Sequence, residues 1–184
     1  MLPNGRREPR ARGRGGITTG DRFDAFTARA KRALGRAQTE ALRRHHTHIG
    51  PEHLLLGFTG PEAGTAARVL ATLGVDRRQV QHAVEGTLDR GRVRVRGSLR
   101  LTPGAKRVIR LAVEEADRLR HTHIGTEHLL LGLLCGGDRL AAGALQRLGV
   151  TPAQVRAQLQ AASPPHPLHL RTLMRVTSDP LAIA

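Results

Sequence analysis

The feature that most constrains the fold of this chain is an internal repeat. Residues 26–80 align without a gap onto residues 101–155 at a constant offset of 75, and 27 of the 55 paired positions are identical. The densest match is HTHIGPEHLLLG (46–57) against HTHIGTEHLLLG (121–132). Self-similarity at a fixed offset marks a structural unit that occurs more than once. The sequence therefore predicts one fold unit in two copies.

Each copy has the residue periodicity of α-helices. In 102–120 the apolar residues recur at intervals of three and four, which places them on one helix face. Thr102 and Thr151 each precede a proline, a typical helix start. Gly74 and Gly149 follow leucine-rich stretches, where a left-handed glycine often ends a helix. The predicted helices are 26–44, 52–58, 63–73, 76–89, 102–120, 126–134, 138–148 and 152–161.

Two copies of four short helices would each bury little surface alone. We therefore expect an all-α fold in which the two four-helix repeats pack about a pseudo-twofold axis into one eight-helix domain. The segment Gly91–Leu99 alternates like a strand, but it has no evident partner and is interpreted as an extended linker. The predicted division is a disordered Arg/Gly-rich arm (1–22), the helical domain (23–162, with repeats at 23–90 and 100–162 and the linker at 91–99) and a Pro-rich tail (163–184).

The chain is strongly basic, with 30 Lys and Arg against 15 Asp and Glu. Of the net charge of +15, +4 falls in residues 1–22 and +1 in residues 163–184, so the helical body carries the remainder. Such a charge favours an anionic partner. The single cysteine, Cys135, cannot form an internal disulfide, and no apolar run approaches the roughly 18 residues of a membrane span. We expect a cytoplasmic protein that does not bind a membrane.

The repeated blocks resemble a known family. The first copy reads F-T-x-x-A-K (26–31), H-x-x-I-G-P-E-H-L-L-L-G (46–57) and A-A-x-x-L-x-x-L-G-V (66–75). The second copy reads L-T-P-x-A-K (101–106) and H-x-H-I-G-T-E-H-L-L-L-G (121–132). This pattern resembles the N-terminal double Clp repeat of ClpC-type AAA+ unfoldases. The resemblance covers about residues 23–162.

The resemblance implies a function in binding rather than catalysis. Clp N-domains dock adaptors and substrates, and this chain has no G-x-x-x-x-G-K-[ST] phosphate-binding loop. The expectation is a free-standing N-domain without the ATPase modules, which is not an enzyme, has no catalytic residues and needs no cofactor. Its expected partners are the Clp ATPase, adaptors, substrate proteins or peptides, which it either bridges to the unfoldase or sequesters from it.

Four residues are candidates for ligand binding by the same resemblance. Glu52 and Glu127 occupy equivalent positions in the two copies, and so do Thr27 and Thr102. The resemblance to ClpC-like N-domains implies that these residues line pockets for phosphorylated arginine. The glutamate would accept the guanidinium, and the threonine would lie near the phosphate. The alternative is structural, because a carboxylate in a first turn stabilises the helix through its dipole. Both roles stay open on sequence.

Six histidines at matched positions invite a metal hypothesis, because His and Glu are common zinc ligands. They are His46, His48, His53, His121, His123 and His128. Neither copy has the H-E-x-x-H spacing of a zinc helix, so we interpret them as structural and predict no metal site.

A second function from another class rests on the N-terminal arm. Six arginines in residues 1–22 could contact nucleic-acid phosphates in a salt-dependent manner. The arm has no aromatic residue to stack on bases. The leading prediction is therefore a protein- or peptide-binding module of the Clp system, and the alternative is a basic accessory protein that binds nucleic acid.

Overall fold

The structure is a computed structural model that describes residues 24–60, 64–86, 88–91, 97–136 and 139–162. The predicted arm (1–22), the tail (163–184) and most of the predicted linker (91–99) lie outside the described residues. Nothing in the structure therefore tests the arm, the tail or the interior of the linker.

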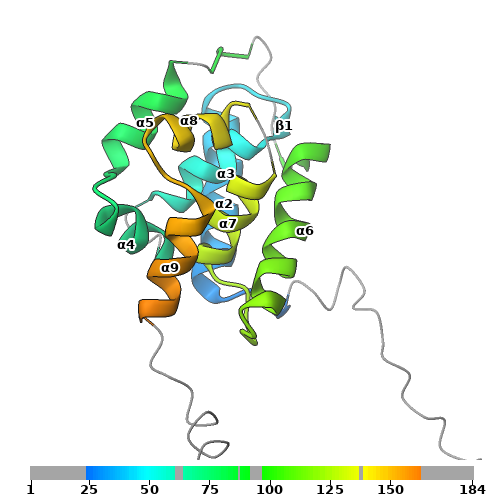
Figure 1. Ribbon diagram of the computed structural model, residues 1–184. Coiled ribbons are helices and arrows are strands. Elements are labelled where there is room, and N and C mark those ends of the chain that lie inside the picture. Colours follow the sequence, from blue (N-terminus) through cyan, green and yellow to red (C-terminus); the bar gives the residue numbers. More distant parts are fainter. Residues whose placement is uncertain (1–23, 61–63, 87, 92–96, 137–138, 163–184) are drawn as a thin grey trace, which may run out of the picture.

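The described part of the chain contains eight helices and very little strand, which confirms the all-α prediction (Figure 1). The first repeat contributes α2 (Ala28–Arg43), α3 (Pro51–Phe58), α4 (Thr65–Thr72) and α5 (Arg77–Glu85). The second contributes α6 (Pro103–Arg118), α7 (Thr126–Cys135), α8 (Ala141–Arg147) and α9 (Pro152–Ala162). The predicted helices all exist, with ends that differ by up to four residues. In the part of the chain that is described, no helix is both long enough and apolar enough to cross a bilayer.

The helix starts and stops follow from local chemistry. The Thr102 hydroxyl accepts a hydrogen bond from the Ala105 N–H (3.1 Å), as Thr151 does from Gln154 (3.3 Å). Gly74 and Gly149 have φ angles of 76° and 77°, the left-handed conformation that glycine adopts most readily. The predicted caps and glycine stops are therefore confirmed.

Small residues allow the two longest helices to approach their neighbours closely. On α2 the buried residues are all alanines, and on α6 alanines again dominate the buried face. Against them pack α3 and α7, which are buried on nearly all sides and lie at the centre of the domain (Figure 1). The core is a single cluster built mainly from aliphatic side chains.

In the described part of the chain, one short parallel strand pair and one isolated parallel bridge, which the sequence analysis did not predict, join the repeats. Strand β1 (His48–Ile49) pairs with β2 (Arg100–Leu101), with Ile49 opposite Leu101. Phe26 forms a parallel bridge with Ile124. The offset of 75 converts one pairing into the other, because Phe26 corresponds to Leu101 and Ile124 to Ile49. Each repeat therefore hydrogen-bonds to the other through the same segments, as a pseudo-twofold arrangement requires.

Candidate functional site

The strand pairing places the start of α6 beside the start of α3. The Thr102 N–H donates to the Ile49 carbonyl (3.0 Å), and Ile49 lies three residues before Glu52. A Cβ added at Gly104 would lie 3.2 Å from the Pro51 ring, so the first turns of the two helices are in contact. Thr102 and Glu52, which come from different repeats, are thus brought to one place.

The second pair of candidate residues is assembled in the same way. The Thr27 N–H donates to the Ile124 carbonyl (3.0 Å), which places the start of α2 beside the start of α7 and Glu127. The Thr126 hydroxyl accepts from the Ala66 N–H (3.2 Å) and ties the start of α4 to the same place. Each candidate site therefore takes its threonine from one repeat and its glutamate from the other.

Both glutamate carboxylates lie over the amino end of their own helix. A Cβ on Gly50 would overlap the Glu52 carboxylate, and a Cβ on Gly125 would overlap that of Glu127. The side chains are only 13% and 17% exposed. A carboxylate at this position interacts favourably with the unsatisfied N–H groups and the dipole of the helix. The structural role considered from the sequence is therefore present in both copies.

The electrostatics of Glu52 keep it ionised. Burial acts to raise the pKa of this carboxyl, but the adjoining His53 ring, a hydrogen bond from its own backbone N–H and the nearby His46 leave the pKa below its ordinary value of 4.5. An ionised carboxylate is the species that accepts a guanidinium. The adjoining start of α6 supplies a threonine hydroxyl and helix N–H groups, which favour anions. The arrangement can thus hold a ligand that carries both charges.

The two sites differ in their surroundings. At the site of Thr27 and Glu127 the side chain of Arg29 extends toward α7, since it lies 3.0 Å from a Cβ added at Gly64, close to the Thr126 hydroxyl. The equivalent of Arg29 at the other site is Gly104, which has no side chain, and it follows Pro103, which has no N–H. The helix that carries the threonine therefore supplies a cation at the site of Thr27 and Glu127 and none at the other site.

The histidines form an ordered hydrogen-bond chain. In the second copy the Gly125 N–H donates to His128 Nδ1 (2.9 Å), so His128 carries its proton on Nε2 and donates to His121 Nδ1 (2.9 Å). The first copy repeats both contacts between Gly50, His53 and His46, at 2.9 and 2.8 Å. His53 and His128 are fully buried and act as caps for α3 and α7, in agreement with their structural interpretation.

The same geometry bears on the metal hypothesis. His46, Glu52 and His53 have potential ligand atoms within 4.8 Å of one another, as do His121, Glu127 and His128. However, the paired ring nitrogens are 2.8 and 2.9 Å apart, whereas two nitrogens on a tetrahedral zinc are separated by about 3.3 Å at bond lengths of about 2.0–2.1 Å. The nitrogens are placed for a shared proton. The absence of a metal stays a prediction.

Sequence reasoning identified the four candidate residues but not how they combine. The exchange between repeats depends on the strand pairing, and a two-residue strand has almost no sequence signal. The sequence analysis did not single out Arg29. Its counterpart in the second copy is a glycine, and the candidate residues were those that both copies share. The constant offset of 75 was the available clue to the symmetry of the two sites.

The sequence matches the family described as the Clp repeat N-terminal domain, over residues 25–138 and 114–172. The chain belongs to this family, whose repeat domain is non-catalytic. It is 43% identical over 137 residues to the negative regulator of genetic competence ClpC/MecB of Bacillus subtilis, and 42% identical over 137 residues to the chloroplastic chaperone ClpC1 of Arabidopsis thaliana. These matches cover 74% of this chain but only 17% and 15% of the relatives, so the chain spans about one sixth of their length.

Solved structures with the same fold are also Clp N-domains. The N-terminal domain of ClpD from Arabidopsis thaliana aligns with a TM-score of 0.56 at 25% identity, covering 75% of this chain and 96% of that structure. The N-domain of ClpV from Vibrio cholerae aligns with a TM-score of 0.67 at 19% identity, covering 85% and 92%. A ClpV N-domain in complex with a VipB peptide aligns with a TM-score of 0.63 at 21% identity, covering 76% and 87%. The fold is thus that of an N-domain which binds a peptide in at least one relative.

Proposed function

We propose that this chain is a non-enzymatic binding module of a Clp protease system that holds protein segments, adaptors or substrates. Membership in the Clp repeat family and the peptide complex of a ClpV N-domain support this proposal. The chain either bridges a captured client to a Clp ATPase or competes with the unfoldase's own N-domain. Recovery of the Clp ATPase in a pull-down supports bridging, whereas loss of client degradation on addition of the chain supports competition.

The proposed ligand at the two threonine and glutamate sites is phosphorylated arginine. The observation that carries this proposal is the contact between helix starts, which sets a largely buried glutamate carboxylate beside a neighbouring helix start with its threonine. A guanidinium requires the carboxylate, and a phosphate requires the helix start with its threonine. Neither the carboxylate nor the helix start alone would select a group that carries both a positive and a negative charge.

The proposal predicts that the two sites bind with different strength. Arg29 adds a cation near the expected phosphate at the site of Thr27 and Glu127, whereas Gly104 adds nothing at the other site. A close cation on a phosphate is worth about 1–2 kcal/mol, so we expect affinities that differ by about tenfold. Replacement of Arg29 with glutamine should bring the two affinities together.

The test is isothermal titration calorimetry with phosphoarginine. We expect two binding events for the parent, loss of the tighter one in Glu127→Gln and loss of the weaker one in Glu52→Gln. Free arginine should bind far more weakly, and Glu114→Gln on the exposed face of α6 should behave like the parent. The double variant Glu52→Ala and Glu127→Ala should unfold within about 1–2 kcal/mol of the parent, because it loses only two first-turn carboxylates. Unchanged phosphoarginine binding in that variant contradicts the proposal.

A further inference from the structure

A polar cleft of about 320 Å³ lies in the first repeat, away from the threonine and glutamate sites. It opens between the C-terminal ends of α2 and α3 and the exposed face of α5. The segment that follows α5 closes one rim, because the Gly91 N–H donates to the Arg44 carbonyl (2.9 Å) and a Cβ at Gly91 would collide with the His45 carbonyl. The charged lining residues are Glu40, Arg43, Arg44, Arg77, Glu85 and Arg90.

Because the domain is pseudo-symmetric, the cleft can be compared with the equivalent place in the second repeat, which a side chain fills. In the second repeat Arg156 lies at this place and binds Glu115 through Nε (2.9 Å) and Nη2 (2.8 Å). Arg118 adds a further hydrogen bond to Glu115 (2.9 Å), whose side chain is 3% exposed. The Arg156 hydrogen bond leads the effects that hold the pKa of Glu115 below its ordinary value. In the second repeat, the Arg156 side chain thus occupies the place that corresponds to the cleft.

The first repeat has no arginine at the position that corresponds to Arg156. Gln81 stands where the second repeat has Arg156, and it turns to Glu85 (2.9 Å) rather than to Glu40. Among the described residues, the side chain of Glu40, the counterpart of Glu115, makes one ion pair, at 3.4 Å with Arg43, and it is 25% exposed. The space that a guanidinium occupies in one repeat is open in the other.

The open cleft has an excess of hydrogen-bond donors and positive charge. Arg44 donates to Glu85 through Nη2 (2.9 Å), but its Nε is buried without a hydrogen-bond partner among the described residues. Within the described residues, Arg77 and Arg90 form no ion pair. Four guanidinium groups face two carboxylates, which leaves the cleft at +2. A buried donor without an acceptor costs free energy that an incoming acceptor recovers.

We propose that this cleft binds a carboxylate side chain of an acidic peptide segment. The net charge and the unpartnered donor require an anion with at least one acceptor oxygen, and a carboxylate can take a guanidinium such as Arg44 in bidentate fashion. The two glutamates that already line the cleft penalise a dianionic phosphate more than a monoanionic carboxylate. The excess of arginine disfavours a guanidinium ligand. The inference rests on the proposed function only in that the domain holds protein segments.

The decisive variant is Gln81→Arg, which gives the first repeat the arginine that the second repeat has at position 156. The introduced guanidinium can reach Glu40 as Arg156 reaches Glu115, so it fills the cleft and satisfies the carboxylate. Because the variant adds a positive charge, general electrostatic attraction to an acidic peptide rises. A specific site and nonspecific attraction therefore predict opposite changes in affinity. Arg44→Met, which removes the central donor, is a second variant with the same expected loss.

The probe is a fluorescein-labelled peptide with alternating glutamate and glycine, and its matched control has glutamine in place of glutamate. Fluorescence anisotropy is measured in about 0.15 M salt, where charges beyond about 8 Å are screened. We expect the parent to bind the glutamate peptide at least about tenfold tighter than the glutamine peptide, and Gln81→Arg to weaken it by about tenfold. The thermal midpoint of the variant should equal or exceed that of the parent.

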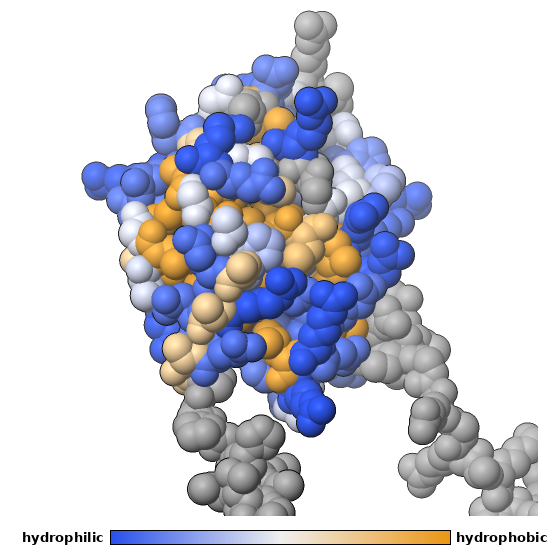
Figure 2. All heavy atoms as spheres, viewed as in Figure 1, coloured by the Kyte–Doolittle hydropathy of each residue, from blue (hydrophilic) through white to orange (hydrophobic). Residues whose placement is uncertain are grey.

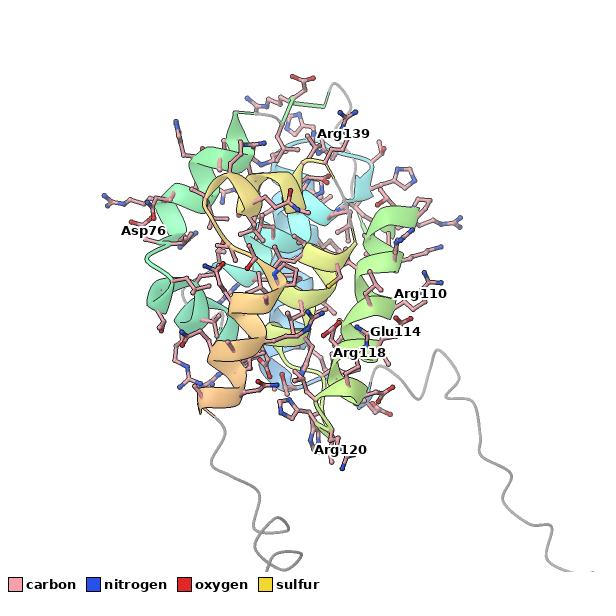
Figure 3. The ribbon with its side chains drawn as sticks, in the orientation of Figure 1. Asp76, Arg110, Glu114, Arg118, Arg120 and Arg139 are labelled. Carbon is pink, nitrogen blue, oxygen red and sulfur yellow. The ribbon has the colours of Figure 1, made fainter. Side chains whose placement is uncertain are left out.

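Two controls distinguish binding in this cleft from binding elsewhere on the surface. The variant Arg110→Gln removes an exposed arginine of α6, which lies across the molecule from Asp76 at the start of α5 (Figure 3). It lowers the net charge yet should change the affinity less than twofold. The Glu52→Ala and Glu127→Ala variant should keep acidic-peptide binding, and Gln81→Arg should keep phosphoarginine binding. Failure of this inference and failure of the proposed function are therefore distinguishable.

Three outcomes overturn the inference. The first is unchanged or tighter binding of the glutamate peptide to Gln81→Arg and Arg44→Met. The second is equal affinity of the parent for the glutamate and glutamine peptides. The third is displacement of the peptide by inorganic phosphate at lower concentration than by acetate, which would identify phosphate as the preferred anion.

Discussion

At the scale of single residues, the buried histidines link the start of each central helix to its surroundings. His128 accepts from the Gly125 N–H and donates to His121, so its two ring nitrogens are both engaged while the ring is neutral. A proton added at Nδ1 would place two donors face to face. Burial is the leading cause that lowers the pKa of His128 from its ordinary value of 6.5. Protonation of His128 therefore destabilises the folded state, and folding disfavours protonation of His128.

This opposition gives a pH dependence with a definite sign. The pKa is lower in the folded than in the unfolded chain, so the contribution of His128 is constant above about pH 6.5 and is lost as the pH falls below it. The loss at pH 5 is at most about 2 kcal/mol, because each pH unit can cost about 1.4 kcal/mol. Urea unfolding between pH 8 and pH 5 measures this decline.

The matched variant for this prediction is His128→Gln. Glutamine at the third helical position accepts from the residue before the helix, as Gln79 does from Asp76 (2.8 Å) and Gln154 from Thr151 (2.9 Å). The variant keeps this cap and removes the titrating ring. Its free energy of unfolding should fall less between pH 7 and pH 5 than that of the parent. An equal fall in both proteins would contradict the assignment to His128.

At the scale of elements, close helix contacts decide which glycines can be replaced. Gly132 on α7 faces the backbone of α6, where an added Cβ would overlap the Val108 carbonyl and lie 2.7 Å from the Ala112 nitrogen. Gly35 on α2 has nothing within 4 Å of the same position. Both residues lie within helices, so the intrinsic helix propensity is gained in both cases.

The same substitution should thus have opposite effects at the two positions. Gly35→Ala should stabilise the domain by about 0.5–1 kcal/mol, the difference in helix propensity. Gly132→Ala should destabilise it by about 1–3 kcal/mol, because α6 and α7 must move apart to admit the methyl group. Thermal and urea unfolding monitored by circular dichroism provide the measurement. A stabilised Gly132→Ala variant would show that α6 and α7 have room for a methyl group between them.

Sequence patterns predicted the elements far better than the contacts between them. Helix periodicity, Thr102, Thr151, Gly74 and Gly149 act locally, so the helices and several of their ends followed from short windows of sequence. The pairing of Ile49 with Leu101 joins distant segments through backbone atoms alone, and no residue type encodes it. The cleft in the first repeat likewise depends on which side chain fills a space. These features required the arrangement of the elements.

At the scale of the whole molecule, the repeats are held together at two symmetric places and through a shared core. Ile49 and Thr102 on one side correspond to Ile124 and Thr27 on the other, with the same N–H to carbonyl distance of 3.0 Å. The central helices α3 and α7 contact each other across the axis. The surface seen in Figure 2 is mostly hydrophilic, with apolar side chains showing between the polar ones. The repeats thus share one interior.

An isolated repeat should therefore not be stable as a monomer. Residues 24–90 alone would expose the face of α3 that α7 covers and leave Ile49 without a strand partner. We expect no cooperative unfolding transition for this fragment at low concentration, because half of the shared core is missing. Mixing it with residues 97–162 should restore helical content and the 1:1 complex. Circular dichroism and size-exclusion chromatography on the separate and mixed fragments test this expectation, and a cooperatively folded monomeric fragment would contradict it.

The crossed origin of the threonine and the glutamate has a consequence for how such a molecule could arise. One copy alone carries both residues but does not bring them together, whereas two identical copies about a twofold axis form two such pairs at once. A symmetric homodimer of a single ancestral repeat would already have had both. Gene duplication and fusion would then have allowed the two places to diverge, and Arg29 opposite Gly104 is a difference that a homodimer of identical copies cannot acquire.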